Sequence, residues 1–164
     1  MKTETQANVS QVISPSELLE HWQGHRNLTR KMIEAFPEEK LFTYSIGGMR
    51  PFAEMAVELL SIASQGIKGL VTDQWEDLKN DMDHGNSKAK LLEIWDQTTE
   101  KINTYWPQLS LERFHETTVC FGKYEGKVYS LLLYFVDNEI HHRGQGYVYL
   151  RSLGIEPPYF WERL

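Results

Sequence analysis

The stretch NEIHHRGQGYVYLRSLG, residues 138–154, places a compact cluster of polar side chains inside an otherwise apolar and strongly helical segment. On a helix, residues four apart lie one above the other, so Asn138 and His142 share a face. Gln145 and Tyr149 continue this face and are expected to line any pocket there. Apolar residues precede them on the same line, which indicates that the face turns toward the core. Buried polar groups need partners, and a metal ion is one candidate partner.

This stretch forms the end of a helix that we predict over residues 128–153, and three further helices are predicted upstream, over residues 15–36, 51–70 and 87–106. The first begins with a capping box formed by Ser14 and Glu17. Pro51 suits the first turn of the second helix. Ser87 opens the third, and Pro107 stops it. Each amphipathic segment must cover its apolar stripe with another helix, so the sequence predicts an all-α, antiparallel four-helix bundle.

The segments between these helices are less regular. Asp73 is predicted to cap a short helical extension that contains Trp75 and Leu78, and residues 80–86 to form a polar loop. Between residues 107 and 127 the helical period is lost, and two glycines predict an irregular segment or a short hairpin before the last helix. The chain is predicted to be one domain over residues 1–164, with residues 1–13 as a flexible tail.

Composition narrows the possible partners and compartments. The formal net charge is −6 and the pI is about 5.5, which argues against a nucleic-acid partner. The single cysteine, Cys120, cannot form an internal disulfide and fits a reducing cytoplasm. No stretch approaches the ~20 apolar residues of a membrane span, and the N-terminus lacks the features of a signal peptide. A cytoplasmic protein that does not enter membranes is expected.

The run HHRGQGYVYLRSLGIEPP, residues 141–158, resembles the C-terminal signature of the DinB-like, or YfiT-like, four-helix bundle family of metal-dependent enzymes. A Gly-Met-Arg-x-Phe start of the second helix, residues 48–52, and a tryptophan-rich third helix add to the resemblance. It implies a bundle with an unusual long connection, frequent homodimerisation, and often a divalent metal held by three histidines. One of these histidines comes from the second helix, and two, four residues apart, come from the last.

Carried across by position, the resemblance implies that only part of this triad is present. His142 matches the second histidine of the last helix, whereas Asn138 stands where the other would be. Glu58 stands at the position of the histidine of the second helix. Imidazole with carboxylate suits Zn, Ni or Fe, but an amide oxygen is a weak ligand. Because two of the three family histidines are replaced, a divalent metal is expected to be either weakly bound or absent.

Two functions fit these residues. The first is a metal-dependent thiol transferase or hydrolase, in which the metal polarises a thiol or water; without metal, Glu58 or His142 could act as a general base. The second is a non-catalytic homodimeric bundle that acts in a stress response or binds a small ligand. In that case Glu58 and His142 form a buried hydrogen-bonded pair between the helices, and Asn138 satisfies a leftover donor.

Other polar residues have weaker signals. Arg143 is a candidate for anchoring an anionic substrate, although its spacing from Glu139 is typical of a helix-surface ion pair. Gly144, inside a helix, predicts that another group packs closely there. His25 lies on the inward stripe of the first helix and is expected to form a wall of the central pocket. With His21 it forms an HxxxH pair, but without a third ligand a metal site is not expected there.

Overall fold

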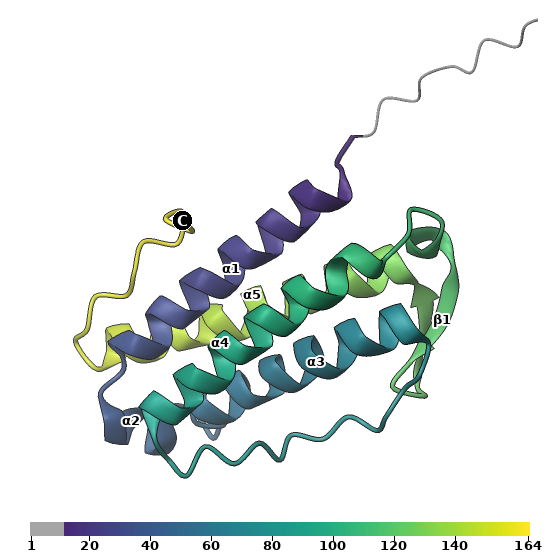
Figure 1. The fold of residues 1–164 in the computed structure, drawn as a ribbon. Helices are drawn as coiled ribbons and strands as arrows, with labels where there is room; N and C mark the ends of the chain where they lie inside the picture. The colour runs from purple at the N-terminus through teal and green to yellow at the C-terminus, as the bar shows by residue number, and fades with distance from the viewer. Residues whose placement is uncertain (1–11) are drawn as a thin grey trace, which may run out of the picture.

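The computed structural model describes residues 12–164 and confirms the four-helix bundle (Figure 1). The four long helices are α1 (Pro15–Ala35), α3 (Phe52–Thr72), α4 (Lys88–Tyr105) and α5 (Val128–Ser152). Helices α4 and α5 each pack against both α1 and α3. The predicted flexible tail lies outside the described residues except for its last two. Within residues 12–164, no helix has the length and apolar character needed to cross a membrane.

Local capping sets the ends of the long helices. At the start of α1, the Ser14 hydroxyl accepts a hydrogen bond from the Glu17 amide at 3.2 Å, and the Ser14 amide donates to the Glu17 carboxylate at 2.7 Å. At the start of α4, the Ser87 hydroxyl accepts a hydrogen bond from the Lys90 amide at 3.3 Å. After α5, Gly154 takes the left-handed conformation with φ of 75°. The Ile155 amide then donates to the Leu150 carbonyl, which closes the last turn.

Two connections differ from the prediction. A short helix, α2 (Glu38–Thr43), was not predicted; it begins directly after Pro37 and buries Leu41 against the end of the bundle. The predicted helical extension at Asp73 is wrong, because residues 73–84 contain no helix. Asp73 instead ends α3 with φ of 57°, and its carboxylate accepts hydrogen bonds from Arg113 and Thr118. These tertiary contacts turn the chain out of the helix.

The predicted hairpin before the last helix is confirmed. Strands β1 (Thr117–Cys120) and β2 (Tyr124–Lys127) pair in antiparallel fashion, with Thr117 opposite Lys127. Two single-turn 3₁₀ helices, η1 (Trp106–Gln108) and η2 (Arg113–His115), lie between α4 and β1. The hairpin packs against the starting end of α5 and the final end of α3, so it closes one end of the bundle (Figure 1).

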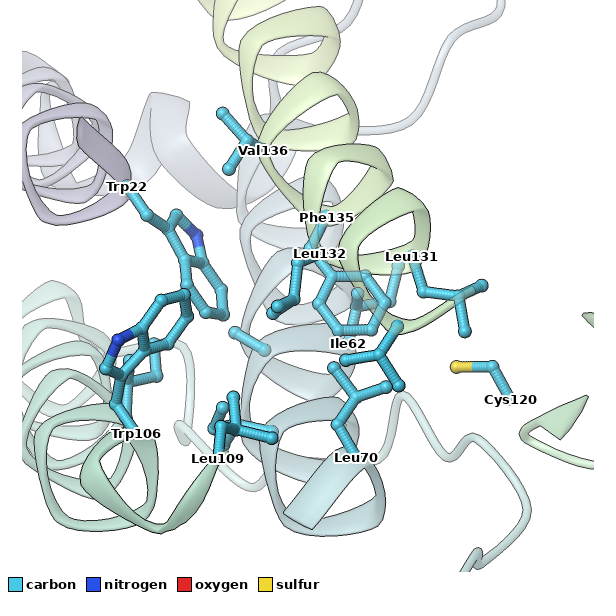
Figure 2. Packing of buried hydrophobic residues seen from close by; sticks show 14 of the residues in the cluster. Trp22, Ile62, Leu70, Trp106, Leu109, Cys120, Leu131, Leu132, Phe135 and Val136 are labelled. Atoms are coloured by element: carbon cyan, nitrogen blue, oxygen red, sulfur yellow. The ribbon is translucent and has the colours of Figure 1, made fainter. Parts of the chain in front are cut away.

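The hydrophobic core is divided into two clusters. One lies toward the hairpin, where Trp22, Trp106 and Phe135 come together from three different parts of the chain (Figure 2). The other lies toward α2 and includes Phe52 and Trp95. The middle parts of the long helices carry buried polar side chains: His25, Arg26, Thr29, Ser61, Thr98, Glu139, His142 and Arg143. The bundle therefore contains a polar layer between two apolar clusters.

Candidate functional site

Glu58 and His142 meet between α3 and α5. The Glu58 Oε1 atom lies 3.1 Å from the His142 Nε2 atom, and the two side chains are 21% and 9% exposed, respectively. The two residues are 84 positions apart in the chain, and the structure brings them together as predicted. The carboxylate reaches solvent, whereas the imidazole is largely enclosed.

The other nitrogen of the His142 ring is also engaged. His142 Nδ1 lies 3.0 Å from the Oε1 atom of Gln145, one turn later on α5. An amide oxygen only accepts, so Nδ1 carries the proton in this arrangement. Neutral His142 then directs the lone pair of Nε2 at the Glu58 carboxylate. Two lone pairs at 3.1 Å need a proton or a cation between them. Rotation of the Gln145 amide, which makes Nε2 of His142 the donor to Glu58, supplies the proton, and a metal ion bound by the pair would supply the cation.

Arg50 is a member of this site that the sequence analysis did not single out. Its Nη2 atom lies 2.7 Å from the second carboxylate oxygen of Glu58. Burial raises the pKa of Glu58, but hydrogen bonds from Arg50 and His142 lower it more, so this pKa lies below its ordinary value. Tyr149 holds the Arg50 segment, because its hydroxyl donates to the Arg50 carbonyl at 2.9 Å. The available signal was the Gly-Met-Arg-x-Phe motif, in which Arg50 is the arginine.

Asn138 lies one turn before His142 on α5 and is half-buried. In the described part of the chain no hydrogen bond joins its side chain to Glu58 or His142, and its amide nitrogen is buried without a partner. Rotation of the amide exchanges its nitrogen and oxygen, so this position can present either a donor or an acceptor to the interior. An unpartnered amide here is compatible with a weak third ligand.

The donor set fits a weak metal site and does not fit the family's three-histidine site. Across residues 12–164, no three His, Cys, Asp or Glu side chains are grouped closely enough to hold a metal ion. Catalytic zinc sites usually have three protein ligands, and here only Glu58 and His142 are strong donors in contact. Arg50 also competes for the carboxylate. If a divalent ion binds, Glu58 and His142 would hold it, with the Asn138 amide as the third group.

His25 does not join this pocket. Its Nδ1 atom lies 2.8 Å from Arg143 Nη2, and its Nε2 atom lies 3.2 Å from His21 Nε2. A guanidinium can only donate, so Nδ1 of His25 accepts from Arg143, and Nε2 faces a second guanidinium, Arg163 Nη1, at 3.2 Å. Burial, with the positive charges of Arg143 and Arg163, lowers the pKa of His25 to about 3. The positive charges of Arg143 and Arg163 on either side of the ring would repel a metal cation, which argues against a His21–His25 metal site.

The predicted surface pair of Glu139 and Arg143 is wrong, because both residues are buried, with 2% and 5% exposure. Arg143 donates to the His25 carbonyl and approaches the Thr29 hydroxyl, and Thr29 donates to Glu139 at 2.7 Å. The i, i+4 spacing does not reveal which face of a helix is buried. Arg143 therefore ties α5 to α1 and does not point toward Glu58.

The predicted close packing at Gly144 is also wrong. A Cβ atom there would meet open space, whereas a Cβ atom at Gly146 would lie 2.5 Å from the Met32 methyl and 2.7 Å from a Phe52 ring carbon. The glycine that allows α5 to approach α1 and α3 is two positions later than expected.

Comparisons with known proteins agree with this architecture. The sequence model described as the DinB family matches residues 1–163. A curated relative, the uncharacterized protein YjoA from Bacillus subtilis, is 26% identical, with 91% of this chain and 97% of that protein covered.

Solved structures show the same fold. A DinB-like protein from Bacillus cereus has a TM-score of 0.71 at 17% identity, with 89% of this chain and 97% of that chain covered. The DinB-like protein YjoA from Bacillus subtilis has a TM-score of 0.71 at 21% identity, with 90% and 99% covered. YfiT from Bacillus subtilis, described as a probable metal-dependent hydrolase with an unusual four-helix bundle topology, has a TM-score of 0.61 at 15% identity, with 92% and 95% covered. The chain therefore belongs to the DinB family.

Proposed function

We propose that this chain is a metal-dependent hydrolase or thiol transferase with a low-affinity divalent-metal site formed by Glu58, His142 and Asn138. The observation that carries the proposal is the 3.1 Å approach of the Glu58 carboxylate to His142 Nε2, while Gln145 engages the other ring nitrogen. A histidine metal ligand commonly donates its second ring N–H to an oxygen in this way. Zn, Ni and Fe suit the imidazole and carboxylate.

A divalent metal supplies Lewis-acid activation of water or of a thiol. The residues of the chain have separate roles in this proposal. Glu58 would hold the ion through the carboxylate oxygen that faces His142, because its carboxylate is ionised at neutral pH and partly exposed. Gln145 fixes the ring orientation of His142. Since Arg143 is buried against α1, Arg50 replaces it as the group that would bind an anionic part of a small substrate.

The direct test is elemental analysis of protein purified without a histidine tag, followed by calorimetric titration of Zn²⁺ and Ni²⁺ into chelator-treated protein. The proposal expects binding with a stoichiometry near one and its loss in Glu58→Ala and His142→Ala. Glu54→Ala, one turn earlier on α3, and His115→Ala, exposed on η2, are controls that should bind normally. Equal binding in Glu58→Ala and wild type would refute the site.

The second candidate is a non-catalytic bundle in which the same residues only stabilise the structure. The contact that favours it is the Arg50–Glu58 ion pair, which together with His142 gives both carboxylate oxygens a partner. This candidate expects no metal binding, unchanged thermal unfolding after chelator treatment, and destabilisation by Glu58→Ala. The two candidates therefore differ in metal stoichiometry and not in the effect of the variant on stability.

Both candidates include a homodimer. The outer face of α5 carries exposed apolar side chains that would suit such a contact: Tyr129, Leu133, Ile140 and Val148. Size-exclusion chromatography with light scattering tests this part of the proposal. A monomer at all concentrations, with no change on Leu133→Asp, would contradict it.

A further inference from the structure

Ser64 and Lys101 form a second polar contact between helices, separate from the Glu58 site. Ser64 lies on α3 and Lys101 on α4, and the Lys101 Nζ atom is 2.8 Å from the Ser64 Oγ atom. Both side chains are half-buried. A hydroxyl and an amine at this distance can exchange a proton directly.

The two residues open into a pocket. It has a volume of about 440 Å³ and is lined by residues of α3, α4 and the long connection that follows α3. Met82 and Asp83 of the connection and Thr98 of α4 line it together with Ser64 and Lys101. A small molecule can therefore reach the Ser64–Lys101 contact. A hydrogen bond buried in the core would not be accessible in this way.

The surroundings of Lys101 make its amine easier to deprotonate than that of a free lysine. Burial lowers the pKa of Lys101, and the nearby ammonium of Lys68 lowers it further, while Glu76 acts in the opposite direction. Lys68 forms an ion pair with Glu76 at 2.7 Å, so the Glu76 carboxylate is bound to Lys68 and not to Lys101. Once Lys101 has lost a proton, its lone pair can accept the Ser64 hydroxyl proton.

We propose that Ser64 and Lys101 form a nucleophile and base pair that cleaves small acyl esters. Ser64 Oγ forms a bond to the ester carbonyl carbon, and its proton passes to Lys101 Nζ. The bond from that carbon to the leaving oxygen breaks, and the leaving group takes the proton from Lys101. Water then attacks the serine ester, with Lys101 again taking and returning a proton, which releases the acid and restores Ser64.

The pair is tested with a fluorophosphonate probe, which forms a phosphorus–oxygen bond to an activated serine and releases fluoride. Intact-mass and peptide analysis should find one adduct, on Ser64, and Ser64→Ala should abolish it. Lys101→Met should slow the labelling on the order of 100-fold, the usual size of a general-base contribution. p-Nitrophenyl acetate hydrolysis, measured with a chelator present to exclude any metal-dependent activity, should fall in parallel.

Lys101→Arg separates a base from a structural contact. Arginine keeps the positive charge and can still donate to Ser64, but it does not give up its proton near neutral pH, so labelling should remain slow and lose its rise with pH. Ser61→Ala, one turn earlier on α3, and Lys90→Met, in the same pocket, should label at the wild-type rate. Far-ultraviolet circular dichroism checks that each variant is folded.

Three results would overturn the pair: no adduct on Ser64, an adduct on Lys101 in its place, or an unchanged labelling rate in Lys101→Arg. None of these measurements involves metal or the Glu58 site. Success or failure here is therefore independent of the function proposed above.

Discussion

Glu139 Oε2 and Arg26 Nη1 face each other 4.0 Å apart in the bundle interior, with 2% and 1% of their side chains exposed. Burial raises the pKa of Glu139, against the opposing effects of Arg26 and Thr29, and burial also lowers the pKa of Arg26. Arg26 is further held by the Trp95 carbonyl and by stacking 4.4 Å above the Trp95 ring. Arg26 thus connects α1 to α4 through Trp95 and faces Glu139 of α5, between the two apolar clusters.

Removal of one member of this pair should be far more damaging than removal of both. Glu139→Leu leaves the Arg26 charge buried without its acid, and we expect a loss of about 3–5 kcal/mol in the free energy of unfolding. The double variant Arg26→Met, Glu139→Leu should recover part of that loss, because it removes the Arg26 charge, while Arg143 lacks Glu139 in both variants. Urea denaturation at neutral pH measures both values. A double variant less stable than Glu139→Leu would contradict this account.

Gly146 and Gly144 form a matched pair of substitutions on α5. Alanine at Gly146 would place its Cβ atom 2.5 Å from the Met32 methyl, so we expect a loss of about 1–3 kcal/mol in the free energy of unfolding. Alanine at Gly144 meets open space and should instead stabilise the helix by about 0.5–1 kcal/mol. Chemical denaturation of the two variants measures the difference. Equal changes in the free energy of unfolding at the two positions would show that helix propensity alone, and not packing, determines the effect of alanine.

Arg50 should weaken metal binding at the Glu58 site. Its guanidinium occupies one carboxylate oxygen of Glu58 and places a positive charge where a cation would bind. Arg50→Met should therefore tighten Ni²⁺ binding on the order of tenfold by removing this competition. Arg151→Met, which removes the same charge from the exposed end of α5, should have little effect. Unchanged or weaker binding in Arg50→Met, measured by titration calorimetry, would contradict the competition.

His25 should make stability fall in acid. Its pKa is lowered from 6.5 to about 3 in the folded chain, so between these values the unfolded chain binds a proton that the folded chain does not. The free energy of unfolding therefore decreases as pH falls through this window. The contribution of His25 to this slope corresponds to the uptake of about one proton on unfolding. His25→Gln should reduce that slope. Nitrogen NMR should also show a neutral His25 ring, and an imidazolium signal near pH 6 would contradict the lowered pKa.

Short-range physics explains which features were predicted. The Ser14 capping box, the Ser87 cap and the left-handed Gly154 involve residues within a few positions of each other, so the ends of α1, α4 and α5 could be inferred from sequence. The end of α3 could not, because Arg113 and Thr118, both distant in sequence, hold the Asp73 carboxylate. The family signature supplied Glu58 and His142 as candidates.

The sequence by itself determined the helical bundle, since apolar periodicity and local caps act within each helix. Only the tertiary structure decided how the polar residues of the middle layer are partnered. In the folded chain, Glu139 faces Arg26, which lies 113 positions earlier, and Glu58 forms an ion pair with Arg50. A buried charge takes the opposite charge that packing brings within reach, and the spacing of residues along one helix contains no information about the neighbouring helix.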